Sequence, residues 1–231
     1  MFMMWDPTYW LFAAPALILA LVAQWWVQHS YQKYLQVRNG ANMTGLEATK
    51  HMMNRIGLRL RVEQARGTLS DHYDPRSKTL RLSQEVANRP SVTSVAIAAH
   101  ELGHAQQDAD EYVPMRVRSG LVPLVNFTSW LGPILFMAGL WLAIQPIAWL
   151  GVVAFGAAAV FALVTLPVEI NASRRGLHLL EQSAILTSPA EKKKARRVLT
   201  AAALTYVAAL AQAISTLLYF MTLLGGGRRR R

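Results

Sequence analysis

Residues 119–168 read SGLVPLVNFTSWLGPILFMAGLWLAIQPIAWLGVVAFGAAAVFALVTLPV, and none of these fifty residues is Lys, Arg, Asp or Glu. As a single helix the stretch would be roughly 75 Å long, about two hydrocarbon cores and a turn. Gln145-Pro146 is the natural break between two spans, near Val122–Ile144 and Ile147–Thr165. The stretch therefore predicts a hairpin of two membrane helices and excludes a purely soluble chain.

Two further apolar segments, one near each end of the chain, are also long enough to cross a membrane. Tyr9–Val27 has aromatic residues at both ends, as membrane-interface anchors do. It lacks a basic start, and Trp25-Trp26 stands where small residues would precede a cleavage site, so we expect a retained anchor rather than a cleaved signal. With Leu199–Leu224 as the last segment, the sequence predicts about four transmembrane helices.

The charges of the chain flank these spans. The formal net charge is +11, and no Lys or Arg precedes Lys33; thirteen lie in Lys33–Arg118, seven in Arg174–Arg197 and four in Arg228–Arg231. This placement is typical of membrane topology and not of a nucleic-acid-binding surface. We expect both internal basic segments in the cytoplasm and the N-terminus outside, although four crossings would then also put the terminal arginine run outside. The absence of cysteine excludes disulfides, thiol catalysis and Cys-ligated metals.

The segment between the first and second spans is more polar and is expected to form a small α+β domain. Met43–Ile56 has apolar residues near helical spacing, with Thr44 as a helix cap. Leu58–Val62 and Thr79–Leu82 are predicted as short strands, and the residues between them are rich in turn formers. A second helix, SVTSVAIAAHELGHAQQD, is expected to begin after a capping Ser91.

This second helix contains the motif HExxH. His100 and His104 are four residues apart and so lie on one helix face, where both imidazoles can reach one metal ion. Glu101 lies beside His100, close enough to meet a water on that metal without binding the metal itself, as a general base would. Imidazole and water suit zinc, whereas Mg²⁺ and Ca²⁺ sites need mostly carboxylate oxygens. The motif predicts a Zn²⁺ site with Glu101 as its catalytic residue.

A hydrolytic zinc site needs a third protein ligand and one open position. Asp108 shares the helix face, but a rigid helix would carry it past the metal. Asp110 has the spacing of a metzincin ligand, but Gln107 stands where that motif needs a chain-turning glycine. Glu169 follows the uncharged run on a later helix, which is the arrangement of gluzincins, whose third ligand is a remote helical Glu. We favour Glu169 and keep Asp110 as an alternative.

Three ordered motifs, SDHYDPRSKTLRLS, SVAIAAHELGHAQQ and LPVEINASRRG, resemble those of the YugP-type neutral zinc metallopeptidases of prokaryotic membranes. These are distant relatives of the HtpX-type membrane proteases, and the resemblance spans about Tyr9 to Leu224. It implies zinc ligation by His100, His104 and Glu169, with Glu101 as the base. The HtpX type has an Asp four residues after its Glu ligand, where this chain has Ser173, so orientation of a histidine is expected to come from elsewhere, such as Ser173 or Asn171.

The sequence offers several candidates for two further roles, stabilisation of the transition state and binding of the substrate chain. A donor for the oxyanion of the transition state could come from one of several side chains, and the His72-Tyr73 turn and Arg174 are favoured over Arg175 and His178. The strand near Thr79–Leu82 is a candidate edge strand for pairing with an extended substrate.

The expected fold is a mostly α integral membrane protein with about four transmembrane helices and a small α+β gluzincin-like zinc-peptidase domain. The expected function is zinc-dependent endopeptidase hydrolysis of membrane or membrane-near polypeptides, with the lipid bilayer and a polypeptide substrate as partners and no nucleic acid. The location is expected to be the cell membrane, multi-pass, with the zinc site on the cytoplasmic side. The expected segments are an N-terminal anchor (1–30), the peptidase domain (31–120), a transmembrane hairpin (121–168), a helix with the third ligand and a basic loop (169–198), and a C-terminal span with an arginine tail (199–231).

The sequence argues against two other classes of function. A catalytically weak membrane scaffold or chaperone-like factor with a structural zinc would not need an acid beside the first histidine, so Glu101 argues against it. A small transporter is disfavoured because the uncharged run has no ionisable residue to line a pathway.

Overall fold

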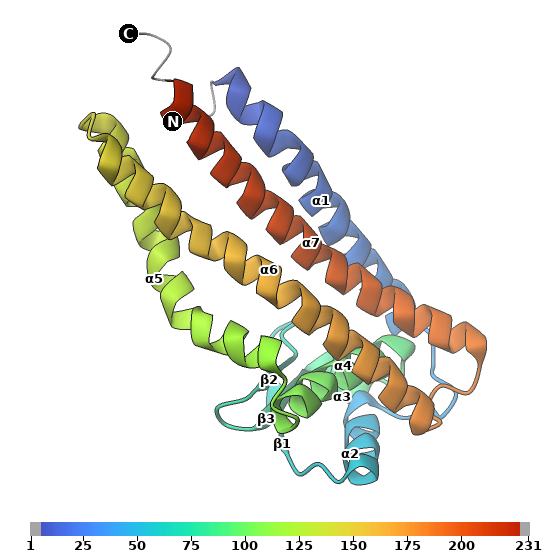
Figure 1. Cartoon of the computed structure of the whole chain (residues 1–231). Coiled ribbons are helices and arrows are strands. Elements are labelled where there is room, and N and C mark those ends of the chain that lie inside the picture. Colours follow the sequence, from blue (N-terminus) through green and yellow to red (C-terminus); the bar gives the residue numbers. More distant parts are fainter. Residues whose placement is uncertain (1–5, 227–231) are drawn as a thin grey trace. The chain divides into compact units, whose positions relative to one another are not determined.

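The computed structural model describes residues 6–226, and the arginine run 228–231 lies outside the described residues. The protein is mostly helical, with seven helices and one small sheet in the described part (Figure 1). In chain order the elements are α1 (Pro7–Leu35), α2 (Gly45–Ile56), β1 (Arg61–Ala65), β2 (His72–Asp74), β3 (Thr79–Ser83), α3 (Gln84–Asn88), α4 (Val92–Ala109), α5 (Val113–Trp141), α6 (Gln145–Gln182) and α7 (Pro189–Gly226).

The helices α1, α5, α6 and α7 are each long and apolar enough to cross a membrane, so the four expected spans are confirmed as helices of membrane length. Their ends differ from the prediction, since α5 begins at Val113 and α6 extends to Gln182. The turn between α5 and α6 lies just before the expected break. Ala143 has a left-handed φ of 56° there, and Pro146 falls in the first turn of α6, where its missing N–H costs no hydrogen bond.

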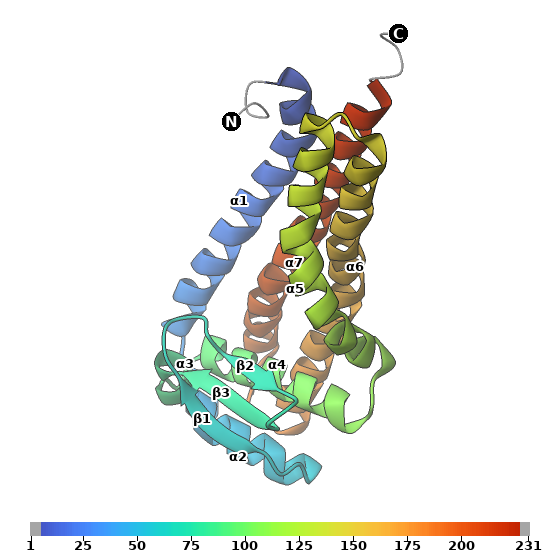
Figure 2. The same cartoon turned by 90° about the vertical axis from the view of Figure 1, so that its left-hand side faces the viewer.

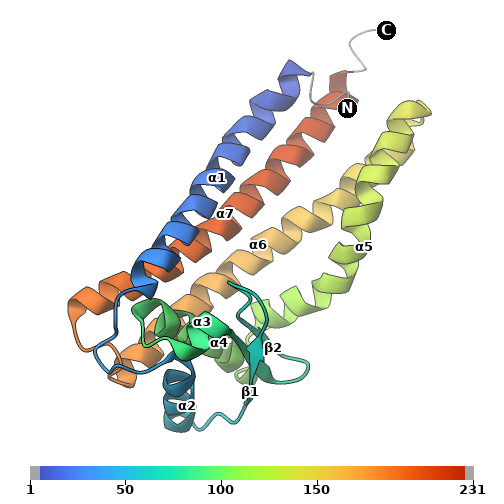
Figure 3. The same ribbon diagram turned by 180° about the vertical axis from the view of Figure 1, so that it is seen from behind.

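The chain forms two compact units. The helical unit comprises residues 6–23, 116–166 and 205–226 of the described chain, and the sheet unit comprises residues 24–115 and 167–204. In the helical unit α1 and α7 run side by side (Figures 1 and 3), joined by hydrogen bonds from the Ser215 hydroxyl to the Phe12 carbonyl (2.5 Å) and from the Tyr219 hydroxyl to Asp6 (3.1 Å). Phe136 stacks on Phe220, with ring centroids 4.0 Å apart.

The sheet of the sheet unit has the strand order β1-β3-β2 (Figure 2). β3 pairs parallel with β1 and antiparallel with β2. Because β3 is the central strand, both its edges are occupied, and the expectation that Thr79–Leu82 forms an edge strand is wrong. The expected turn at His72-Tyr73 is also wrong, since both residues belong to β2, whose three residues are too few to give a period-two pattern in the sequence.

The two helices expected in this unit are confirmed with their caps. The Thr44 side chain accepts a hydrogen bond from the Glu47 N–H (3.2 Å), and the Glu47 carboxylate accepts one from the Thr44 N–H (2.8 Å), which is a capping box before α2. Ser91 caps α4 by accepting from the Ser94 N–H (3.0 Å). α4 lies in the hydrophobic core between α2 and the sheet, and thirteen of its residues are buried.

Candidate metal centre

The two histidines lie on α4, whose backbone comes unusually close to that of α6. A Cβ added to Gly103 would lie 2.3 Å from the Ala172 carbonyl oxygen, and one added to Gly176 would lie 2.7 Å from the Ala99 carbonyl oxygen. Real Cβ atoms do not approach a backbone so closely, so each contact requires glycine. Because Gly103 lies between the two histidines and Ala172 lies three residues after Glu169, this contact brings the later helix to the motif.

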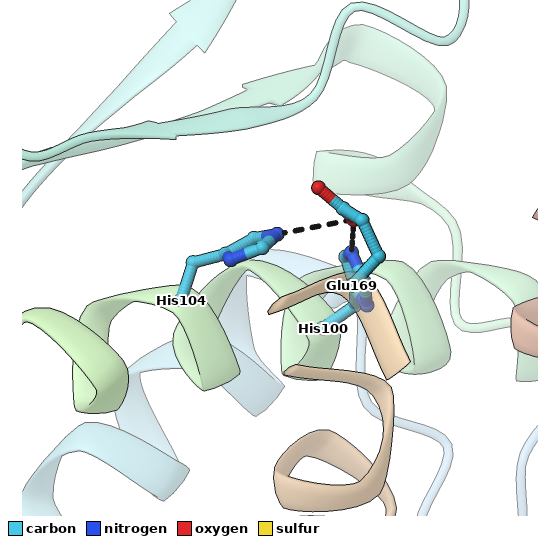
Figure 4. Close-up of side chains that lie close together, drawn as sticks. All are labelled: His100, His104 and Glu169. Carbon is cyan, nitrogen blue, oxygen red and sulfur yellow. Dashed lines mark ion pairs between the residues drawn. The ribbon is translucent and has the colours of Figure 1, made fainter. Parts of the chain in front are cut away.

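His100, His104 and Glu169 converge, as Figure 4 shows. Glu169 Oε2 lies 3.3 Å from His100 Nε2 and 3.4 Å from His104 Nε2. One ligand atom from each residue lies within 4.8 Å of the others, and no other group of three His, Asp or Glu residues in residues 6–226 is so arranged. Glu169 is only 2% exposed, and His104 is 8% exposed. The three residues predicted from the sequence as zinc ligands therefore lie next to one another in the fold.

The donor set fits a zinc ion. Zinc binds imidazole nitrogen at about 2.0–2.1 Å and carboxylate oxygen at about 2.0–2.2 Å in tetrahedral geometry, which puts ligand atoms about 3.4 Å apart. The separations of Glu169 Oε2 from the two Nε2 atoms, 3.3 and 3.4 Å, match that spacing. Two neutral nitrogens and one carboxylate oxygen also form a ligand set that leaves the fourth position open.

The far nitrogen of each imidazole has its own partner. His100 Nδ1 lies 3.1 Å from the hydroxyl of Ser173, one of the two side chains expected to orient a histidine. His104 Nδ1 lies 3.0 Å from Gln107 Oε1, a partner that the sequence analysis missed. Both Nε2 atoms therefore remain on the side of Glu169, as metal-binding histidines require.

Glu101 is 8% exposed and is held by the sheet. Its Oε2 accepts a hydrogen bond from the backbone N–H of Tyr73 on β2 (2.9 Å). The Tyr73 hydroxyl donates to Asp108 Oδ2 on α4 (2.8 Å), so one residue of β2 attaches to α4 at two points. Burial and the Asp108 carboxylate raise the pKa of the Tyr73 phenol, so this hydroxyl remains a donor at neutral pH.

The alternative carboxylates have other partners. Asp108 accepts from Tyr73, as stated, and Asp110 Oδ2 forms an ion pair with the Arg175 guanidinium on α6. The Asp110 side chain is more than half exposed, and neither aspartate belongs to the cluster of three ligands. The geometry thus favours Glu169 over Asp110.

Four of the five oxyanion-donor candidates named from the sequence have other partners. The Tyr73 hydroxyl donates to Asp108, as described above. The Arg175 Nε donates to Asn171 Oδ1 (2.8 Å), and the exposed His178 lies 2.9 Å from the Gln182 amide. Nδ1 of the exposed His72 lies 2.8 Å from the Ser70 carbonyl oxygen. Arg174 is exposed. The donor stays unassigned.

Electrostatics around α4 are dominated by buried carboxylates. Burial lowers the pKa of His104, but the Glu169 hydrogen bond and the charge of Glu101 outweigh it, so the pKa lies above its usual value. Burial also raises the pKa of Asp71, and the nearby negative charge of Glu101 adds to that rise, while hydrogen bonds from Ser83 oppose it. Such shifted groups gather where a fold holds a cation or performs acid–base chemistry.

Comparison with known proteins places the chain in a class. Residues 9–225 match the family described as "Putative neutral zinc metallopeptidase", and the chain belongs to that family. A curated relative from Bacillus subtilis (strain 168), described as "Putative membrane protease YugP", is 40% identical over 195 residues, which are 84% of this chain and 86% of the relative. No solved structure matches. The resemblance drawn from the three sequence motifs is therefore confirmed.

Proposed function

We propose that the protein is a membrane-embedded zinc endopeptidase in which His100, His104 and Glu169 bind Zn²⁺ and Glu101 is the general base. The observation that carries the proposal is the convergence of the two α4 imidazoles on the α6 carboxylate, at separations suited to tetrahedral zinc. The family and its curated relative support a peptidase rather than another use of zinc.

The roles of the chain's own residues follow from their positions. Zn²⁺, when bound, polarises the scissile carbonyl and lowers the pKa of the attacking water. Glu101 accepts the proton of that water as the new C–O bond forms, and then delivers it to the amine nitrogen as the C–N bond breaks. The Tyr73 N–H holds Glu101 Oε2 at 2.9 Å, which leaves Oε1 to carry the proton.

The proposed substrates are polypeptides in or near the membrane. Glu169 is the first charged residue after fifty uncharged ones, and it lies on the same continuous helix as the third apolar span. A ligand directly after such a span favours a site close to the membrane surface, where bound segments of membrane proteins would be within reach.

The test of catalysis is Glu101→Gln. We expect this variant to bind zinc like the wild type. Its rate of proteolysis of a casein-type or membrane-protein substrate in detergent should fall by roughly 10²–10⁴-fold, because general acid–base catalysis contributes a rate enhancement of that size. Glu63→Gln, an exposed carboxylate on β1, is the matched control and should cleave normally. Cleavage by Glu101→Gln at the wild-type rate would contradict the mechanism, and a zinc-bound wild type that cleaves nothing would favour the scaffold function.

The charge distribution further supports a cytoplasmic zinc site, because twenty basic residues lie in the two internal segments. The chain has no cysteine, so single cysteines can be labelled without background. In intact cells a membrane-impermeant thiol reagent should label Leu142→Cys in the exposed α5–α6 turn and leave Thr68→Cys, in the exposed β1–β2 loop, unlabelled. The reverse pattern would contradict the orientation.

A further inference from the structure

Gln107 is a fully buried polar side chain next to the metal cluster. It lies on α4, three residues after His104, and is 0% exposed. Its Oε1 lies 3.0 Å from His104 Nδ1, and its Nε2 donates to the Val168 carbonyl oxygen (2.8 Å) and to Asn171 Oδ1 (2.9 Å), both on α6. Gln107 thus connects one candidate ligand to the helix that supplies another.

The orientation of this amide is determined by an arginine. Arg175 Nε donates to Asn171 at 2.8 Å, and because arginine has only donors, the atom that it meets must be the Asn171 oxygen. Gln107 then faces two acceptors, the Asn171 oxygen and a backbone carbonyl, so the atom that meets them must be its nitrogen.

The orientation of the amide in turn fixes the tautomer of His104. The remaining Gln107 atom is an oxygen, which only accepts, so His104 Nδ1 must carry the hydrogen. His104 Nε2 is left with a lone pair on the Glu169 side, where a metal would be bound. The tautomer of His100 is not fixed in this way, because its partner, the Ser173 hydroxyl, can either donate or accept a hydrogen bond.

We propose that Gln107 is a positioning residue that presents His104 Nε2 to the metal. Its amide oxygen sets the tautomer and ring orientation of His104, and its amide NH₂ attaches α4 to α6. The inference rests on the proposed zinc site, but it does not require that the protein cleave peptides. Partners of this kind are worth about 10–100-fold in metal affinity in other metal sites.

The two halves of the amide can be separated by two substitutions. Gln107→Leu removes both the oxygen and the NH₂, whereas Gln107→Glu keeps an acceptor for the His104 N–H and loses the two donors to α6. Gln106→Leu is the matched control, because Gln106 is the neighbouring glutamine on α4 and only half-buried.

The experiment measures zinc affinity by competition with a chelator and the unfolding temperature of the metal-free protein, both on the full-length chain in detergent. We expect Gln107→Leu to lose about 10–100-fold in zinc affinity and Gln107→Glu to stay within a few-fold of the wild type. Both should lower the unfolding temperature, since both remove the two hydrogen bonds that Gln107 donates to α6. Gln106→Leu should match the wild type in zinc affinity.

The outcomes distinguish a positioning role from a merely structural one. Equal zinc affinities of Gln107→Leu and Gln107→Glu, whether both normal or both weakened, would overturn the proposal. If Gln107→Leu does not fold, Gln107→Met replaces it, because its unbranched side chain fills similar space without polar groups. A wild type that binds no zinc would overturn the metal site and this inference together, whereas a wild type that binds zinc without cleaving overturns only the peptidase function.

Discussion

Helix α6 makes two close contacts through glycine, and they serve different purposes. In the helical unit, Cβ atoms added to Gly139 and Gly151 would lie 2.2 Å from the Ala148 nitrogen and 2.4 Å from the Phe136 nitrogen, so α5 and the first part of α6 touch through apolar surroundings. In the sheet unit, Gly103 allows the same closeness between α4 and the later part of α6. There the contact encloses two histidines, a glutamate and a buried glutamine.

The comparison shows that glycine determines the distance between helices, while the side chains beside it determine what the contact does. Apolar side chains such as Phe136 on α5 and Val152 on α6 give the α5–α6 contact only packing energy. At α4–α6 every buried polar group needs a partner, which makes the contact sensitive to small displacements.

Among the changes that test this comparison, Gly103→Ala is expected to have the largest effect. The new methyl group would meet the Ala172 carbonyl oxygen, so α6 must move on the order of 1 Å and carry Glu169 away from the histidines. A misplacement of that size can cost about 10²-fold in rate. We expect a comparable loss of peptidase activity together with weaker zinc binding, measured by cleavage assay and metal titration.

Gly139→Ala is the matched control for this change. It meets the Ala148 backbone as closely, and both substitutions gain the same helix propensity. We expect overpacking to cost about 1–3 kcal/mol of stability without changing zinc affinity. Equal loss of zinc in both variants would show that the two contacts do not differ as described.

A smaller effect is expected from Tyr73→Phe, which removes the hydroxyl that joins β2 to Asp108. The N–H of residue 73 still holds Glu101, so the rate should fall less than tenfold, and the unfolding free energy should fall by about 1 kcal/mol. A transition-state donor would instead be worth roughly 10²–10³ in kcat. A rate loss of that size would return Tyr73 to the role of oxyanion donor.

The smallest expected effect concerns the buried charge near α4. The pKa of Asp71 is raised in the folded state, so the folded protein holds this proton more tightly. Stability is therefore lost as the pH rises from the ordinary aspartate pKa of 3.8 through the raised pKa. The Asp71→Asn variant has no ionisable group at this position, so it does not lose stability in this way as the pH rises, and its amide can keep both hydrogen bonds with Ser83. Its unfolding temperature, relative to the wild type, should therefore increase with pH across that window.

Asp74→Asn provides a control of opposite sign. Hydrogen bonds from the Ser77 hydroxyl and the Arg76 N–H lower the pKa of the Asp74 carboxyl, so its contribution is present above pH 3.8 and is lost as the pH falls. The unfolding temperature of Asp74→Asn should approach that of the wild type at low pH. Parallel pH profiles of the two variants would contradict the assignment.

Much of this structure could be predicted from the sequence, because the relevant signals are long or local. Spans of nineteen or more apolar residues, the caps at Thr44 and Ser91, and the spacing of His100 and His104 each need only one segment. Glu169 could be chosen because a charge directly after an uncharged run is unusual.

The missed features depend on contacts between distant segments. The sequence shows Gln107 only as a residue that stands where a metzincin has glycine. Nothing local shows that its amide contacts Val168 and Asn171, which lie more than sixty residues later. The position of Gln107, three residues after His104 on a buried face, was the available signal. The sequence predicts a turn at His72-Tyr73 because a strand of only three residues gives no periodic pattern, and its contact with Glu101 arises only in the tertiary structure.

The central claim is that α4 and α6 together hold one zinc ion, and metal analysis of purified protein tests it most directly. Glu169→Gln preserves the volume of the buried side chain but removes its charge, and Asp110→Ala removes the exposed alternative. We expect about one equivalent of zinc in the wild type and in Asp110→Ala, and a marked loss in Glu169→Gln, because three protein ligands are required. Zinc retained by Glu169→Gln and lost from Asp110→Ala would contradict the account.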